Sequence, residues 1–256
     1  MKNFLQKPKE KMDQLIKLGS DALLYQRISR SLMDLMGSYF RIRVEGMENI
    51  PLDSGAVIIP NHSGYAGLDA MILANEIYKA TRRPARVLTH RFWFFSHVTS
   101  KPANLLGFIK ASTQNGVKYL NKDQLVVLFP EGEQGNFKPT IRAYRLQEFK
   151  RGFVRMALLT GRPIVPTVII GAEESHINLK TLKLDKIFGK NTILPLPLNV
   201  IPLPAKWKIK VLKPIYLPFK PDAVNDSELV HSIAQDIQEK MQDAIYAELK
   251  NRTHIF

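Results

Sequence analysis

The chain has 256 residues, 45% of them hydrophobic and 23% charged, which is the composition of an ordinary globular protein rather than a disordered or fibrous one. It contains no cysteine, which excludes disulfide scaffolds, cysteine-based zinc sites and thiol nucleophiles. Its 37 Lys and Arg residues outnumber its 23 Asp and Glu residues, and the net charge of +14 indicates either a polyanionic partner or simply a basic soluble protein.

The N-terminal region predicts an amphipathic helix, because apolar side chains recur at helical spacing over residues 9–36 with Lys and Arg between them. It is interpreted either as a helix docked on its own domain or as an interfacial helix facing anionic headgroups. The first 15 residues lack the apolar core of a signal peptide, and no window supplies the stretch of about 20 apolar residues that a transmembrane helix needs. We therefore expect a cytoplasmic protein that binds peripherally to the inner face of the membrane.

From residue 39 onward, short β-rich segments alternate with helical ones. The expected strands are 39–44, 55–60, 86–90, 124–129 and 163–170, and the expected helices are 68–80, 115–120 and 153–160. Strands that recur between helices in this way are typical of βαβ units. The sequence therefore predicts a single α/β domain with a largely parallel central sheet flanked by helices over residues 37–256, after an N-terminal helical segment over residues 1–36.

Residues 176–205 are rich in Leu, Ile and Pro and lack regular periodicity, so we expect an irregular segment there. It is interpreted either as part of an acyl or membrane contact or as a packed extended connection. Strand character returns over residues 206–217, and residues 227–250 predict a closing amphipathic helix.

A histidine and an aspartate follow the second predicted strand. His62 stands just beyond the carboxyl end of that strand, where α/β sheets build their sites, and Asp69 stands near the start of the next helix. The pair offers a general base and a carboxylate that fixes its tautomer. If residues 62–69 were all helical, about 10 Å would separate the two, so the chain must loop, and Gly64 and Gly67 permit this. The alternative is a histidine bonded to a loop carbonyl and an aspartate that only stabilises a helix start.

A second polar group follows the predicted strand at 124–129. The residues there are Phe-Pro-Glu-Gly, which places Glu131 and Gly132 in a turn. A carboxylate delivered by an apolar strand can hold a substrate hydroxyl or position a basic group. The alternative is an ordinary turn, because Pro, Gly and polar residues form turns in any protein.

Four sequence blocks together resemble the glycerolipid (lysophospholipid) acyltransferase family. They are, in order, Pro60-Asn61-His62 with the downstream Asp69; Gly107-Phe108-Ile109; Phe129-Pro130-Glu131-Gly132; and Arg162-Pro163-Ile164-Val165-Pro166. Any one block is unspecific, but the ordered set is quite specific. The resemblance implies transfer of a fatty acyl group from an acyl thioester, acyl-CoA or acyl carrier protein, to a hydroxyl of a lysophospholipid or other glycerolipid.

The resemblance also implies roles for single residues. His62 would take the proton from the acceptor hydroxyl as general base, with Asp69 orienting it. Substrate-binding roles fall on Asn61, Glu131, Gly132 and Pro166. The implied partners are a lipid acceptor, the donor thioester and an anionic membrane surface. No metal, cofactor or nucleic acid is implied.

Two departures from the family pattern bear on the substrate. The family commonly places four residues between its histidine and aspartate, whereas six separate His62 from Asp69, which indicates a variant branch. A later block usually ends in an arginine that binds the acceptor phosphate, and Thr113 occupies that place. Lys110 or Lys138 could supply the charge, although an ammonium lacks the fork of arginine. An acceptor without that phosphate, such as a mono- or diacylglycerol, becomes more credible.

Two other functions remain open: a non-catalytic basic protein that binds membranes peripherally, and a lipid hydrolase that uses His62 to activate water. The first would leave His62 and Asp69 without a role. The basic stretch of Arg142, Arg145, Lys150, Arg151 and Arg155 is interpreted either as a site for the phosphates of the donor or as a solvated face.

Overall fold

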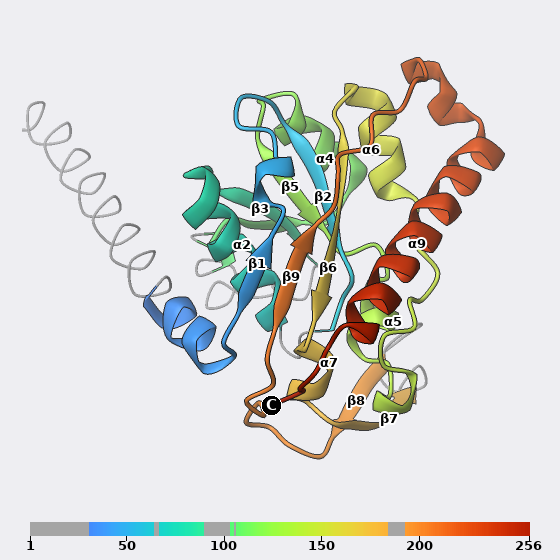
Figure 1. Ribbon diagram of the computed structural model, residues 1–256. Coiled ribbons are helices and arrows are strands. Elements are labelled where there is room, and N and C mark those ends of the chain that lie inside the picture. The colour runs from blue at the N-terminus through green and yellow to red at the C-terminus, as the bar shows by residue number, and fades with distance from the viewer. Residues whose placement is uncertain (1–30, 64–66, 90–102, 105, 184–192) are drawn as a thin grey trace, which may run out of the picture.

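A seven-stranded sheet forms the centre of the protein, shown in Figure 1 as a computed structural model. The structure describes residues 31–63, 67–89, 103–104, 106–183 and 193–256. In spatial order the strands are β1 (Arg43–Glu45), β9 (Lys208–Val211), β6 (Ile164–Ile170), β2 (Ala56–Pro60), β5 (Leu125–Leu128), β3 (Ala85–Thr89) and β4 (Phe108–Lys110). The strands from β6 to β4 run parallel, whereas β9 is antiparallel to β6 and pairs in parallel with β1. The predicted α/β domain with a largely parallel sheet is confirmed.

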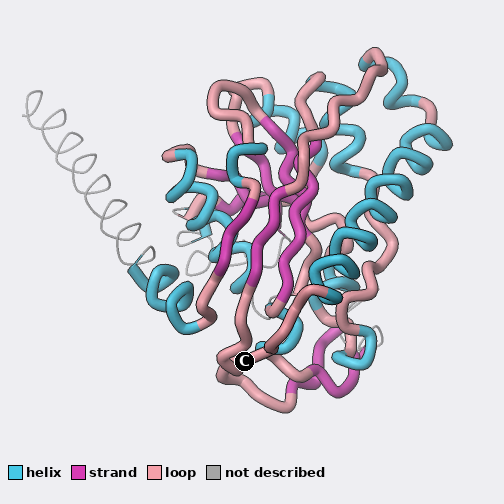
Figure 2. The backbone as a smooth tube through the Cα atoms, in the orientation of Figure 1, coloured by secondary structure: helices cyan, strands magenta, loops and turns pink. Residues whose placement is uncertain are grey.

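Helices cover both faces of this sheet (Figure 2). The described helices include α2 (Leu68–Thr81), α4 (Thr113–Leu120), α5 (Glu133–Asn136), α6 (Gly152–Thr160), α7 (Ala172–Ser175) and α9 (Ser227–Lys250), with 3-10 turns η1 (Met47–Asn49), η4 (Thr140–Arg142) and η5 (Pro221–Asn225). One apolar core joins α2 to Ile58 and Val127, and a second joins α4, α6 and α9 to Val57, Ile59 and Val126. Successive side chains of a strand point to opposite faces, so β2 is buried along its whole length.

Helix α9 has the predicted bounds. The Asp226 carboxylate caps its start by accepting hydrogen bonds from the backbone N–H groups of Glu228 and Leu229, at 3.1 and 2.9 Å. Its buried apolar residues recur at helical spacing: Val230, Ile233, Ala234, Ile237, Met241 and Ile245. The amphipathic pattern in the sequence therefore reflects packing against the sheet.

The predicted N-terminal helix is described only at its end. Residues 31–39 are helical, and the residues before them lie outside the described part of the chain. The predicted strand over 39–44 is wrong in its first four residues, because β1 begins only at Arg43. Phe40 instead stacks on Trp207 with ring centroids 4.6 Å apart, so its apolar character serves core packing. No helix among the described residues is both long enough and apolar enough to cross a membrane.

The expectation of an irregular segment over residues 176–205 is wrong in part. Strands β7 (Asn178–Lys183) and β8 (Ile193–Pro197) pair antiparallel in a separate two-stranded sheet, here called the β7–β8 sheet. β8 alternates Leu with Pro, and proline is tolerated because each strand of such a sheet has one edge without a partner strand. The prolines suppressed the strand signal in the sequence. Figure 1 shows this sheet at the end of the molecule toward which β6 points.

Candidate active site

Three neighbouring parallel strands deliver polar residues to one edge of the central sheet. His62 follows β2, Glu131 follows β5, and Glu173 follows β6 within α7. Strands β5 and β6 flank β2 on its two sides. Because the carboxyl ends of parallel strands meet at the same edge, residues distant in sequence converge there. In Figure 1 the same edge carries α5, α7 and the β7–β8 sheet.

His62 and Asp69 are in direct contact. Nδ1 of the imidazole lies 2.7 Å from Oδ2 of the carboxylate, which also accepts the backbone N–H of Ser63 at 3.0 Å. Asp69 is fully buried at the start of α2. Gly67, just before that helix, has a φ of 77°, which favours glycine and turns the chain into the helix. The chain is therefore non-helical at His62 and Ser63, before residues 64–66, and enters α2 directly after Gly67. Gly64, the other glycine of the predicted loop, lies outside the described residues.

The contact with Asp69 sets the chemistry of the imidazole. A carboxylate at Nδ1 accepts a hydrogen bond from the N–H of that nitrogen, so that the proton stays on Nδ1 and Nε2 keeps its lone pair. The side chain of His62 is 15% exposed, and no residue in the described part of the chain bonds Nε2. The ring lies against Phe129, with centroids 4.2 Å apart. Nε2 is therefore the atom that can take a proton from a bound hydroxyl or water.

Glu131 holds the backbone of the histidine. Its Oε1 accepts the N–H of His62 at 2.9 Å, and its Oε2 accepts the N–H of Gln147 at 2.8 Å. The side chain is 1% exposed. Glu131 therefore positions the loop that carries His62 from the neighbouring strand and is buried behind it.

A buried network of charges continues from Glu131 to the far side of β2. Nζ of Lys138 lies 3.6 Å from Oε2 of Glu131 and 2.9 Å from Oε1 of Glu173. Oε2 of Glu173 accepts the N–H of Tyr144 at 2.9 Å. Lys138 is thus an internal bridge between two strand ends, with both neighbouring carboxylates competing for its charge.

The two carboxylates of this network share one ammonium, and burial favours the protonated form of Glu173. Burial raises the pKa of Glu173 to about 7, although the charge of Lys138 opposes the shift. Burial acts to lower the pKa of Lys138, but the carboxylates of Glu173 and Glu131 outweigh it and keep that pKa above its ordinary value. Lys138 therefore stays charged at neutral pH, where Glu173 changes its charge.

Two further predicted site residues lie within the sheet. Asn61 is fully buried, where its amide donates to the carbonyl of Ile169 at 3.0 Å and accepts the N–H of the same residue at 2.7 Å. Pro166 is a buried residue of β6, in register with Ile59 of β2. The geometry gives Asn61 the role of joining β2 to β6 next to His62, and it places Pro166 inside the sheet.

The predicted phosphate-binding residues lie on neighbouring elements. Lys110 is exposed at the end of β4, at the edge of the sheet. Thr113 begins α4, whose preceding residue Ser112 caps the helix by accepting the N–H of Asn115 at 3.1 Å. The Thr113 hydroxyl would lie 4.0 Å from a Cβ placed on Gly152, the first residue of α6. The starts of two helices are therefore adjacent beside this part of the sheet.

Gly132 makes room for a lysine of the predicted basic stretch. Its φ is 60°, and a Cβ there would lie 2.6 Å from Nζ of Lys150. The N–H of Lys150 donates to the carbonyl of Pro130 at 2.9 Å. With Arg151, Lys150 lines a hollow of about 360 Å³. Among the described residues, no carboxylate forms an ion pair with Lys150.

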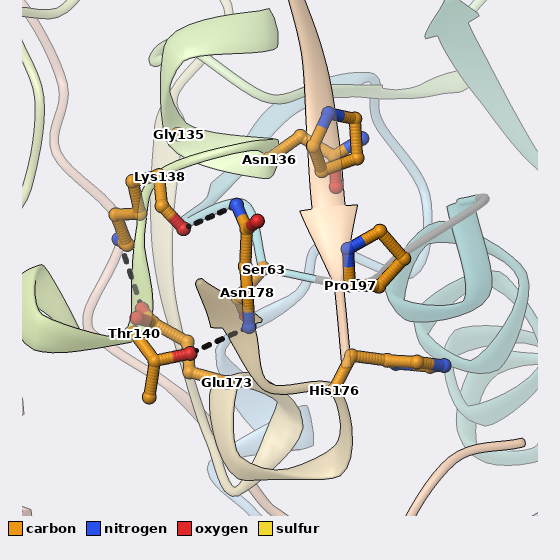
Figure 3. Close-up of a pocket in the computed structure, with 10 residues that line it drawn as sticks. Ser63, Gly135, Asn136, Lys138, Thr140, Glu173, His176, Asn178 and Pro197 are labelled. Carbon is orange, nitrogen blue, oxygen red and sulfur yellow. Dashed lines mark hydrogen bonds and ion pairs between the residues drawn. The ribbon is translucent and has the colours of Figure 1, made fainter. Parts of the chain in front are cut away.

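A small polar cavity of about 30 Å³ lies on the other side of the network (Figure 3). Its walls include Ser63, Asn136, Lys138 and Glu173 from the central domain and Asn178 from β7. The hydroxyl of Ser63 and the amide oxygen of Asn136 are buried and have no hydrogen-bond partner within the described chain. This volume suits about one water molecule, which these groups could bind.

Sequence reasoning missed Glu173, Gln147 and the contact between Phe129 and His62. Glu173 comes shortly after a predicted strand, so the strand-end rule that selected His62 and Glu131 applies to it as well. Gln147 acts through its backbone N–H, which leaves no trace in the sequence. Within the described residues, no three His, Asp or Glu side chains are arranged to hold a metal ion.

The fold and site define an α/β protein with a histidine–carboxylate pair at the carboxyl edge of its sheet. The family model described as Acyltransferase matches residues 41–170, which include His62, Asp69, Glu131 and Pro166. The chain belongs to this family, and its resemblance to glycerolipid acyltransferases is confirmed.

Relatives and a solved structure agree with this assignment. An uncharacterized protein of Mycobacterium tuberculosis is 34% identical over 231 residues, which cover 86% of this chain and 64% of the relative. This chain thus spans just under two thirds of that relative. A 1-acyl-sn-glycerol-3-phosphate acyltransferase of Bacillus subtilis is 24% identical over 65% of this chain and 81% of its own. The crystal structure of the 1-acyl-sn-glycerophosphate acyltransferase PlsC of Thermotoga maritima has the same fold, with a TM-score of 0.61 at 16% identity, over 89% of this chain and 80% of that chain.

Proposed function

We propose that the protein transfers a fatty acyl group from an acyl thioester, acyl-CoA or acyl carrier protein, to a hydroxyl of a glycerolipid. The observation that carries the proposal is the 2.7 Å contact between Nδ1 of His62 and buried Asp69, in a chain of the acyltransferase family. The named activity of the Bacillus subtilis relative supports the same reaction class.

The reaction follows from the free nitrogen of the imidazole. Nε2 of His62 takes the proton of the acceptor hydroxyl while that oxygen attacks the thioester carbonyl carbon. The carbon–sulfur bond then breaks, and the leaving thiolate receives the proton from Nε2. Asp69 stabilises the imidazolium between these steps. The sequence of steps needs no metal, no cofactor beyond the donor and no covalent acyl-enzyme.

The acceptor phosphate, where one is present, requires a cation other than Lys138. Lys138 is 8% exposed and already lies between two carboxylates. Lys150 and Lys110 are exposed at the same edge of the sheet. We assign the phosphate of the acceptor to Lys150, because its ammonium lies over Gly132 and no described carboxylate pairs with it. A lysine supplies a point charge, so discrimination for a phosphate should be weaker than with arginine.

Peripheral binding to an anionic membrane surface, on the inner face where a soluble thioester donor is available, completes the proposal. The net charge of +14 supports it, because each basic residue near an anionic surface contributes about 1 kcal/mol. Nucleic acid is not part of the proposed function.

An acyl-transfer assay in detergent micelles tests the proposed function. Purified protein is incubated with acyl-CoA or acyl carrier protein and with lysophosphatidic acid or monoacylglycerol, and released thiol and acylated lipid are both measured. The wild type should release thiol only with an acceptor, His62→Ala should lose at least about 10²-fold in rate, and the control His231→Ala should keep full activity. Thiol release without acylated lipid would indicate a hydrolase, and no reaction with any pair would indicate a non-catalytic protein.

A further inference from the structure

Three leucines of the β7–β8 sheet lie on its outside. Leu179 and Leu182 of β7 and Leu196 of β8 are exposed. The residues that alternate with them, Asn178 and Pro197, line the polar cavity beside Ser63. A two-stranded sheet on a soluble domain normally turns its apolar face inward, because side chains alternate between the two faces. Here the alternation is reversed.

The apolar surface continues beyond β8. Leu198, Val200 and Ile201 follow the strand and are 65%, 77% and 80% exposed. We call the whole set the apolar edge; it consists of Leu179, Leu182, Leu196, Leu198, Val200 and Ile201. The hydroxyl of Tyr39 donates to the carbonyl of Pro202 at 2.7 Å, so the helix over residues 31–39, with its exposed Leu32 and Leu35, adjoins the apolar edge. Contiguous exposed apolar surface of this kind marks a binding surface.

The charges in the sequence of the apolar edge are mostly positive. Residues 177–206 contain five lysines and one acidic residue, Asp185. Lys180 is exposed, in register with Leu196 on the opposite strand. Apolar residues flanked mainly by cations match the interface of an anionic bilayer, where acyl chains lie beneath negative headgroups.

We propose that the apolar edge inserts into the headgroup region of an anionic membrane and brings the site to its lipid acceptor. The inference rests on the proposed function for its purpose, since a lipid acceptor has to reach His62. The inner face of the β7–β8 sheet shares its cavity with Ser63, the residue after His62. Asn178 fixes the sheet to the site, because its amide donates to the carbonyls of Phe137 and Lys138 at 2.7 and 3.0 Å. A membrane bound at the outer face therefore lies one layer of chain away from the catalytic loop.

Site-specific labelling tests the surface directly, because the chain has no native cysteine. Leu198→Cys and Leu52→Cys are each labelled with an environment-sensitive fluorophore and mixed with phosphatidylglycerol–phosphatidylcholine vesicles. Leu52 is the control, because it is 67% exposed and precedes β2 at the opposite edge of the sheet. The label at position 198 should shift to the blue and be quenched by acyl-chain quenchers, whereas the label at position 52 should not. A label at 198 that stays in water while the protein floats with vesicles would overturn the proposal.

A binding variant separates this surface from the N-terminal helix and from catalysis. The full chain with Leu196→Asn, Leu198→Asn and Ile201→Asn should lose about tenfold or more in partitioning to anionic vesicles, and Leu52→Asn should bind as the wild type does. The triple variant should keep its rate on a micellar acceptor and lose rate on a vesicle-embedded one. Unchanged partitioning of the triple variant would refute the inference. It would also be refuted if the wild type were a dimer and the three substitutions made it monomeric without weakening its binding to vesicles. Vesicle binding is measured without any reaction. Absence of acyl transfer would therefore contradict the proposed function but not the membrane-binding inference.

Discussion

The imidazole of His62 is held from three directions. Asp69 binds its Nδ1, Glu131 binds its backbone N–H, and Phe129 packs against its ring. Asp69 comes from the start of α2, whereas Phe129 and Glu131 come from the segment after β5, so the position of the imidazole depends on the assembled sheet and not on the local loop. Catalysis by a positioned base is sensitive to displacements of about 1 Å, so residues that never touch substrate can affect the rate.

Replacing Glu131 tests this positioning. Glu131→Gln keeps one acceptor oxygen for the N–H of His62, but its amide nitrogen cannot accept the N–H of Gln147 or pair with Lys138. Because a hydrogen bond to a charged group contributes about 1.5–3 kcal/mol, we expect kcat to fall roughly tenfold or more. KM for the acceptor should change little, since the side chain is buried behind the loop. A rise in KM with constant kcat would instead place Glu131 in contact with substrate.

At the scale of elements, the site depends on three parallel strand ends that are tied together by buried polar groups. Asn61 links β2 to β6, and the network of Glu131, Lys138 and Glu173 links the ends of β5 and β6 across β2. Buried charges are costly unless they are paired, so this network specifies one arrangement of the loops.

The raised pKa of Glu173 predicts a pH dependence of stability. Between pH 4.5 and about 7 the carboxyl is protonated in the folded protein and ionised in the unfolded chain. The folded state then binds more protons, so the free energy of unfolding falls as pH rises through this window, by up to about 3 kcal/mol. This contribution of Glu173 to the free energy of unfolding is fully present below pH 4.5 and lost above pH 7.

Chemical denaturation at pH 5 and pH 8 measures this effect. Glu173→Gln imitates the protonated carboxyl, so the free energy of unfolding of this variant should lose this part of the pH dependence. Relative to the wild type, the variant should become more stable as pH rises. Glu239→Gln, on the exposed face of α9, is the matched control and should follow the wild type. Equal pH slopes for Glu173→Gln and the wild type would show that Glu173 is not the group that holds the proton.

Over the whole molecule, periodicity predicted the parallel sheet and most of its elements. Buried parallel strands such as β2 and β6 appear as continuous apolar runs, and α9 shows its core face in its spacing. The β7–β8 sheet was not predicted from the sequence, because the prolines of β8 are typical of segments that interrupt a strand. The beginning of the expected strand at 39–44 was misread because Phe40 packs on Trp207.

The site could be predicted from the sequence only where the side chain itself, rather than the backbone, makes the functional contact. His62 and Glu131 follow strands and Asp69 begins the next helix, so their positions in the sequence predicted that they lie at this edge of the sheet. The pairing of Lys138, which follows α5, with Glu173 of α7 joins residues 35 positions apart, and no local pattern encodes it. Lys138, for which the sequence predicted a phosphate-binding role, lies buried between the carboxylates of Glu131 and Glu173. The backbone donors of Ser63 and Gln147 are set by tertiary packing alone.

The proposed membrane surface and the proposed catalytic pair lie at one end of the molecule. The carboxyl edge of the sheet carries the candidate site, and the β7–β8 sheet lies at that same edge (Figure 1). Its Leu179, Leu182 and Leu196 are exposed. The proposal therefore places a lipid-facing surface and a base on the two sides of one layer of chain. This arrangement can serve acyl transfer only if His62 and Asp69 work as a single catalytic unit.

A double-mutant cycle on acyl transfer tests that central claim most directly. The rate constant kcat/KM is measured for the wild type, His62→Ala, Asp69→Asn and the double variant, with circular dichroism to confirm the fold. Asp69→Asn alone should lose about 10³- to 10⁴-fold, because an amide at Nδ1 favours the wrong tautomer. The double variant should be no slower than His62→Ala, since groups that act as a unit are strongly non-additive. Losses that multiply, or acyl transfer that persists in His62→Ala, would contradict the account.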